Sequence, residues 1–157
     1  MMNDNFNLFL SSVEEQYQDF VQELHDLLTK DQCKCEIKPT KSGYLVSYVF
    51  LKNKKTLANF VFRKSGIKLR IYADHIQQYQ EFLNSLPKKM KKEICKASLC
   101  KRLVNPDDCN PKCAMGYTFS LDDEQYQKCR FMAFMPTLSQ ENNPFIKQFL
   151  INEIAHH

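Results

Sequence analysis

The fold is decided by residues 43–72, which read GYLVSYVFLKNKKTLANFVFRKSGIKLRIY. Strand-forming residues fill Tyr44 to Leu51, Thr56 to Arg63 and Ile67 to Tyr72, and polar or Gly-containing turns separate them. In the last run apolar and polar side chains alternate, so one face of that strand is expected to be buried and the other solvated. This stretch therefore predicts an antiparallel meander.

Helical spacing of apolar residues precedes the meander. It runs from Val13 to Leu28, and a capping box at Ser11 and Glu14, or at Ser12 and Glu15, is expected to begin this helix. Between this helix and the meander, residues 35–38 predict a short strand that Pro39 ends.

More helices are expected after the meander. Asp74 is a suitable cap for one helix, Pro87 suits the first turn of a lysine-rich helix, and Asn143 with Pro144 opens a final helix. Between the last two, residues 117–121 and 125–135 predict a hairpin around the dipeptide at 122–123. The last helix is expected to turn its apolar residues inward: Phe145, Phe149, Leu150 and Ile154.

These elements indicate an α+β fold: an antiparallel sheet of about five or six strands, with helices mainly on one face. The chain has 157 residues, which suits a single domain over residues 1–157. No linker separates residues 1–99, which carry the meander, from residues 100–157, which carry a cysteine-rich loop, the hairpin and the final helix. The second part is therefore expected to be an integrated subregion.

The sequence predicts a cytoplasmic protein that does not enter the membrane. No apolar run approaches the roughly 20 residues that span a bilayer, and residues 1–12 lack the basic start of a signal peptide. Seven cysteines is an odd number, and without a secretory signal a disulfide framework is not expected. The thiols are therefore expected to be reduced.

Four cysteines gather in the last third of the chain: Cys100, Cys109, Cys113 and Cys129. Three residues separate Cys109 from Cys113 in a Pro-containing loop, a spacing that structural zinc sites favour. Cys129 is expected on the hairpin, on the same side as Phe131, where a small buried hydrophobe would lie. Three interpretations stay open: zinc ligands, core packing, and a reactive thiol.

Three motifs in this region are CNPKC at 109–113, GYTF at 116–119 and YQKCR at 126–130. This third of the chain resembles a C-terminal segment of small uncharacterised bacterial proteins, which also occurs beside regulatory domains. The resemblance implies that the cysteine loop and the hairpin belong to one module. It implies no activity and no catalytic residue.

The net charge of +4 conceals an uneven distribution. Residues 33–102 contain seventeen Lys or Arg and four acids, whereas residues 1–32 contain one Lys and seven acids. Such a basic segment suits a polyanion or nucleic acid, although lysines also keep a solvated face soluble. The candidate anion-binding or nucleic-acid-binding residues are Arg63, Lys68, Arg70, Tyr72, Lys88, Lys89 and Lys92.

Catalytic signals are sparse. The three glycines lie far apart, which excludes a recognisable P-loop or dinucleotide-binding turn. A cysteine nucleophile would need His25 or His75 beside an exposed thiol. We therefore expect a non-catalytic binding or regulatory domain, with zinc stabilisation as a hypothesis. The first alternative is a nucleic-acid-binding protein that uses a basic sheet face and the lysine-rich helix. The second is a thiol-based redox sensor or enzyme.

Overall fold

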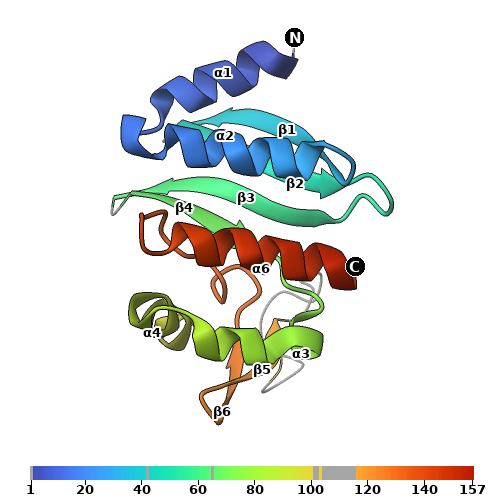
Figure 1. Ribbon diagram of the computed structural model, residues 1–157, viewed down its shortest axis with the longest axis vertical. Coiled ribbons are helices and arrows are strands. Elements are labelled where there is room, and N and C mark those ends of the chain that lie inside the picture. The colour runs from blue at the N-terminus through green and yellow to red at the C-terminus, as the bar shows by residue number, and fades with distance from the viewer. Residues whose placement is uncertain (1, 42, 65, 101–102, 104–115) are drawn as a thin grey trace.

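A four-stranded antiparallel meander forms the larger sheet of the structure and lies in the upper part of Figure 1. The computed structural model describes residues 2–41, 43–64, 66–100, 103 and 116–157. The strands pair in chain order and are β1 (Cys33–Thr40), β2 (Gly43–Phe50), β3 (Thr56–Arg63) and β4 (Gly66–Ile71). The meander predicted from residues 43–72 is therefore confirmed.

Strand β1 is longer than predicted. Pro39 lies inside it, opposite Tyr44, so the prediction that Pro39 ends the strand is wrong. Within the described residues β1 pairs with β2 alone, and the outer side of an edge strand needs no N–H donor. The edge position therefore explains why proline is tolerated there.

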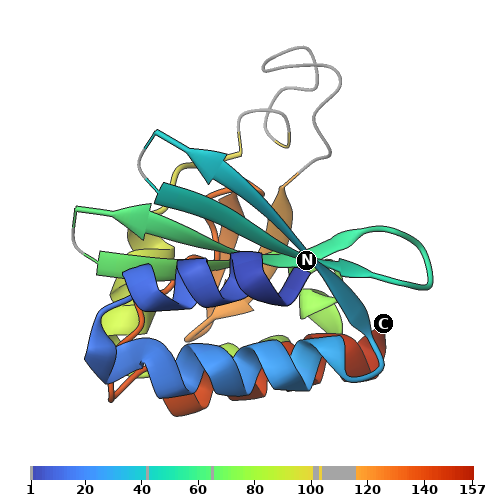
Figure 2. The ribbon, with the colours of Figure 1, turned by 90° about the horizontal axis from the view of Figure 1, so that it is seen from above.

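The helices α1 (Met2–Ser12), α2 (Glu15–Thr29) and α6 (Asn143–His156) pack on the meander, and Figure 2 shows α2 and α6 on the same side of the sheet. The sheet contributes Tyr48, Phe60 and Leu69 to the core beneath them. Buried residues from α1 to α6 form one contiguous cluster, as expected for a single domain.

Helix α1 was not predicted, and it changes the roles of the two serines assigned to a capping box. The hydroxyls of Ser11 and Ser12 donate back to the carbonyls of Leu8 and Phe9, at 2.8 and 2.6 Å, because they end α1. The N-cap of α2 is Glu14, and it makes no side-chain cap hydrogen bond within the described part of the chain. The predicted capping box is therefore wrong.

The second sheet is a hairpin of β5 (Tyr117–Leu121) and β6 (Glu124–Lys128). Asp122 and Asp123 have φ of 50° and 69°, which are the left-handed values of a type I′ turn. The predicted extension of the second strand to residue 135 is wrong, because the chain turns after β6 and the N–H of Ala133 donates to the carbonyl of Cys129. The turn therefore redirects the chain toward the large sheet.

Residues 134–138 then run along the free edge of β4. Leu69 and Ile71 donate their N–H groups to the carbonyls of Pro136 and Phe134, at 3.0 and 2.8 Å. This segment joins the hairpin to the meander. The α+β class with antiparallel strands is confirmed, and the six named strands of the described structure divide between two sheets.

Between β4 and β5 the chain forms α3 (Ile76–Tyr79), the 3-10 helix η1 (Gln80–Ser85) and α4 (Lys88–Lys96), and α3 and η1 contact β5. The N-cap of α3 is His75 and not Asp74, whose carboxylate binds Arg130 instead. Helix α6 buries Ile146, Phe149, Leu150 and Glu153, while the predicted core residues Phe145 and Ile154 are only partly buried. No helix in the described residues is long and apolar enough to cross a bilayer.

Candidate functional site

A surface cavity of about 730 Å³ opens where the β2–β3 turn, the end of β4 and the segment after β6 meet. We call it the Arg130 cavity, and its wall includes Lys55, Tyr72, Asp74, His75, Arg130 and Phe131. These side chains come from distant parts of the sequence. The cavity therefore exists only in the folded chain.

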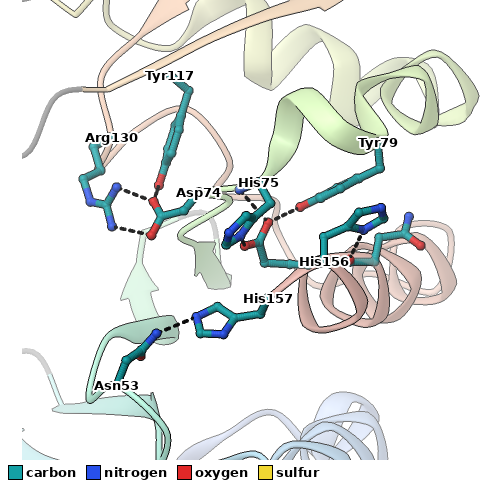
Figure 3. A network of polar contacts seen from close by, with 10 residues as sticks. Asn53, Asp74, His75, Tyr79, Tyr117, Arg130, His156 and His157 are labelled. Carbon is teal, nitrogen blue, oxygen red and sulfur yellow. Dashed lines mark hydrogen bonds and ion pairs between the residues drawn. The ribbon is translucent and has the colours of Figure 1, made fainter.

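One wall of the cavity rests on a buried carboxylate. Glu153 of α6 is 1% exposed, and its side chain accepts hydrogen bonds from His75 Nδ1 at 2.7 Å and from the Tyr79 hydroxyl at 2.6 Å (Figure 3). The backbone N–H of His75 also donates to it, at 3.2 Å. The pKa of Tyr79 is raised far above its usual range by burial and by the Glu153 charge, so its hydroxyl stays protonated.

This arrangement fixes the imidazole of His75. With Nδ1 carrying the proton that Glu153 accepts, Nε2 is the nitrogen left for another partner, and no described residue hydrogen-bonds to it. In the neutral ring this Nε2 accepts a hydrogen bond from a ligand, and in the imidazolium it donates one.

The guanidinium of Arg130 is also fixed by a carboxylate. Its Nη1 and Nη2 donate to the two carboxylate oxygens of Asp74, at 2.5 and 3.3 Å, and its guanidinium lies 5.0 Å from the ring centroid of Tyr72. Burial lowers the pKa of Arg130, but the Asp74 hydrogen bond and nearby negative groups outweigh it, so the net shift is upward. A guanidinium has five N–H donors, so this fork leaves others for a ligand.

His157 also lines the cavity, and Figure 3 shows its ring beside Asn53. Its ring stacks on Phe50 with centroids 3.7 Å apart, and Asn53 Nδ2 lies 3.1 Å from Nε2. Burial and the positive surroundings lower its pKa, which favours the neutral ring at pH 7. The sequence does not predict this packed position.

The free hydrogen-bonding groups of the cavity are mainly donors. The carboxylates of Asp74 and Glu153 already accept hydrogen bonds from Arg130, Tyr79 and His75. Lys55 is exposed, and within the described residues no carboxylate pairs with it. A ligand that suits this arrangement is rich in acceptors, such as a phosphate or carboxylate.

No family model, curated protein or solved structure matches the chain. Function is therefore inferred from the geometry of the cavity and its surroundings.

Two of the residues predicted to bind anions or nucleic acid lie at or beside the cavity. Tyr72 lies in the cavity, and Arg70 Nε donates to the Phe131 carbonyl at 2.8 Å. Lys68 does not line the cavity, and its Nζ pairs with a carboxylate oxygen of Glu93 in α4 at 3.4 Å. Strand β4 therefore links the Arg130 cavity to the lysine-rich helix.

The remaining predicted residues lie apart from the cavity. Arg63 pairs with Gly66 at the other end of β4 and donates to the Phe62 carbonyl. Lys88, Lys89 and Lys92 are exposed on α4, where they can contact a polyanion.

The zinc prediction is only partly covered by the described chain. Cys109 and Cys113 lie outside the described residues, whereas Cys100 and Cys129 lie on segments joined by the Leu99–Lys128 bridge. Cys100 is buried, and its sulfur accepts the Gly116 N–H at 3.3 Å. The described part of the chain holds no group of three or more His, Cys, Asp or Glu side chains arranged for a metal ion.

Elsewhere a thiol and a histidine share one hydrogen-bond partner. Tyr48 hydrogen-bonds to Cys35 and lies 2.9 Å from His25 Nδ1 through the same hydroxyl. Burial raises the pKa of Cys35, and likewise that of Cys33, to about 11, so both stay protonated at neutral pH. Because the thiolate is the nucleophile, this cluster is poorly suited to thiol chemistry.

Glu153, Arg130 and Lys55 are functional candidates that sequence reasoning missed. Glu153 carried a usable signal: it lies four residues after Phe149, on the apolar face of α6, where a charged residue is unexpected. Arg130 carried none, because its role depends on the turn after β6.

Proposed function

We propose that the protein is a binding domain, and that it accepts an anionic ligand in the Arg130 cavity. The carrying observation is that His75 and Arg130 each line the cavity and are each fixed by a carboxylate, while Arg130 keeps further N–H donors and His75 keeps Nε2, which donates in the imidazolium form. Donors that are already oriented lose little conformational entropy when a ligand binds. This geometry supports a ligand-sensing or regulatory role.

The Glu153 cluster supports the proposal because it is costly to maintain. Burying a carboxylate carries a desolvation penalty, and a well-packed hydrophobic residue is often at least as stabilising in its place. Here Glu153 is 1% exposed and accepts three hydrogen bonds, two of which come from His75. Perturbed, buried polar clusters beside a cavity are enriched at functional sites.

The chemistry of the donors supports an anion. Arg130 offers the N–H groups that Asp74 leaves free, the His75 imidazolium offers Nε2–H, and Lys55 adds an ammonium. Phosphate and carboxylate groups accept hydrogen bonds from all three donor types.

Titration with inorganic phosphate tests the proposal directly. Two-dimensional NMR should show saturable shifts in the His75 ring signals and the Arg130 guanidinium signals. Lys55→Ala should weaken phosphate binding severalfold. Lys64→Ala removes the same charge from the turn at the other end of β3 and should leave phosphate binding unchanged. Phosphate that leaves the His75 and Arg130 signals unmoved would disprove anion binding here.

Nucleic-acid binding is a second candidate, supported by α4. Lys88, Lys89 and Lys92 are exposed, and within the described residues no acidic side chain pairs with them, unlike Lys91, which binds Asp122. A labelled single-stranded oligonucleotide should bind with a strong salt dependence. Replacing the three exposed lysines by alanine should weaken binding and flatten that dependence; unchanged binding would reject α4 as the contact surface.

The cellular compartment and the thiol chemistry are part of the same proposal. The cytoplasm is the compartment we propose, since seven cysteines is an odd number and does not suggest a disulfide framework. A thiol-based function would need a thiol other than Cys33 and Cys35, such as exposed Cys95.

A further inference from the structure

Phe131 stands at the rim of the Arg130 cavity with 43% of its surface exposed. Its ring meets that of Tyr72 edge-on, with centroids 6.1 Å apart, and its carbonyl accepts the Arg70 Nε–H at 2.8 Å. Both contacts hold this residue beside the donor groups. The next residue, Met132, is 40% exposed but does not line the cavity.

An inorganic anion would use only part of this site. It would engage Lys55, His75 and Arg130 and leave the aromatic surface of Phe131 in water. Small-molecule sites combine a few placed polar groups with apolar or aromatic walls, and each part usually contacts the ligand. The pairing of donors with an aromatic rim suits a molecule that is anionic at one end and aromatic at the other.

We infer that the ligand class is a nucleoside monophosphate, and this inference rests on the proposed anion site. The phosphate binds the donors of Lys55, His75 and Arg130. The base packs against Phe131 and the neighbouring ring of Tyr72, since every base offers a flat π surface to an aromatic side chain. A cavity of about 730 Å³ lies within the range of small-molecule sites.

Calorimetric titration of the full chain with four probes tests this inference: adenosine 5′-monophosphate, ribose 5-phosphate, adenosine and inorganic phosphate. Adenosine 5′-monophosphate should bind about tenfold more tightly than ribose 5-phosphate, the gain expected from stacking one base. Phe131→Ala should reduce that difference, because only the Tyr72 contact with the base remains, and should leave phosphate binding unchanged. Met132→Ala, with a similarly exposed side chain outside the cavity, should change neither.

The outcomes distinguish the nucleotide assignment from the proposed anion binding. Equal affinity for adenosine 5′-monophosphate and ribose 5-phosphate would overturn the nucleotide assignment while leaving anion binding intact, and so would an unaltered preference in Phe131→Ala. If none of the phosphates binds, the proposed function itself fails. Thermal unfolding of both variants verifies that these exposed substitutions leave the fold intact.

Discussion

His75 Nδ1 lies 2.7 Å from a carboxylate oxygen of Glu153, a contact that joins the start of α3 to α6 across 78 positions of sequence. The Tyr79 hydroxyl reaches the other oxygen of the same carboxylate at 2.6 Å. Helix α6 thereby sets the position of one wall of the Arg130 cavity. The same contact serves stability and site geometry together.

Glu153→Gln should therefore weaken the fold. The amide keeps the shape of the side chain, but it loses the charge and turns an NH₂ group toward donors that need an acceptor. We expect a loss of about 1–3 kcal/mol in the free energy of unfolding, measured with urea at neutral pH. Tyr79→Phe removes one of the donors and should cost about 1 kcal/mol. Wild-type stability in Glu153→Gln would contradict the role given to this carboxylate.

His25 should make the protein less stable in mild acid. Its ring lies 2.9 Å from the Tyr48 hydroxyl and stacks on Phe6 at 3.7 Å, and burial lowers its pKa below the usual 6.5. Between the folded pKa and 6.5 the unfolded chain binds more protons, so stability rises with pH in that window. The contribution is complete above pH 6.5 and is lost as the pH falls toward the folded value.

Urea unfolding at about pH 7.5 and about pH 5.5 measures this effect. His25→Gln stays neutral at both values and should lose less stability between them than the wild type. His157 also has a lowered pKa, so His157→Gln should reduce the pH dependence as well, and the double variant should reduce it further. A pH dependence that is the same in wild type and His25→Gln would show that His25 does not carry it.

Cysteine reactivity should follow burial. Cys33 and Cys35 have pKa values raised to about 11 by burial, so at neutral pH they hold little of the reactive thiolate. Exposed Cys95 should react first among the described cysteines. Timed labelling with an alkylating reagent, mapped by mass spectrometry, measures each site. Rapid labelling of Cys35 in native protein would revive the thiol-based alternative.

The sequence predicted the meander well because its signals are local. Strand β3 has the predicted bounds, Thr56–Arg63, and the turn at Asp122 and Asp123 follows from residues that tolerate positive φ. The site was harder to predict from the sequence, because His75 and Glu153 meet only when α6 packs beside α3. A charged residue on an apolar helix face can be recognised in sequence, but its partner cannot.

Gly116→Ala should destabilise the chain around the small sheet. A Cβ at this position would lie 2.1 Å from the Lys128 carbonyl oxygen and 3.0 Å from Cys100 Cβ. The backbone must shift to relieve such contacts, and we expect a loss of about 1–3 kcal/mol in unfolding free energy. Thr118→Ala, in the same hairpin, removes atoms without creating a clash and should cost less. Equal stability of the two variants would show that the close approach at Gly116 is readily relieved.

Cys100 and Cys129 are the described residues that test the zinc hypothesis. Cys100 is buried and its sulfur already accepts the Gly116 N–H at 3.3 Å; such hydrogen bonds commonly orient metal ligands. If these cysteines bind zinc with Cys109 and Cys113, protein purified without chelator carries stoichiometric zinc, and chelation lowers its unfolding temperature. Cys100→Ser should then lose the metal, whereas Cys33→Ser, which alters a buried thiol of β1, should retain it. Metal-free protein that a chelator leaves unchanged would assign Cys100 and Cys129 to core packing instead.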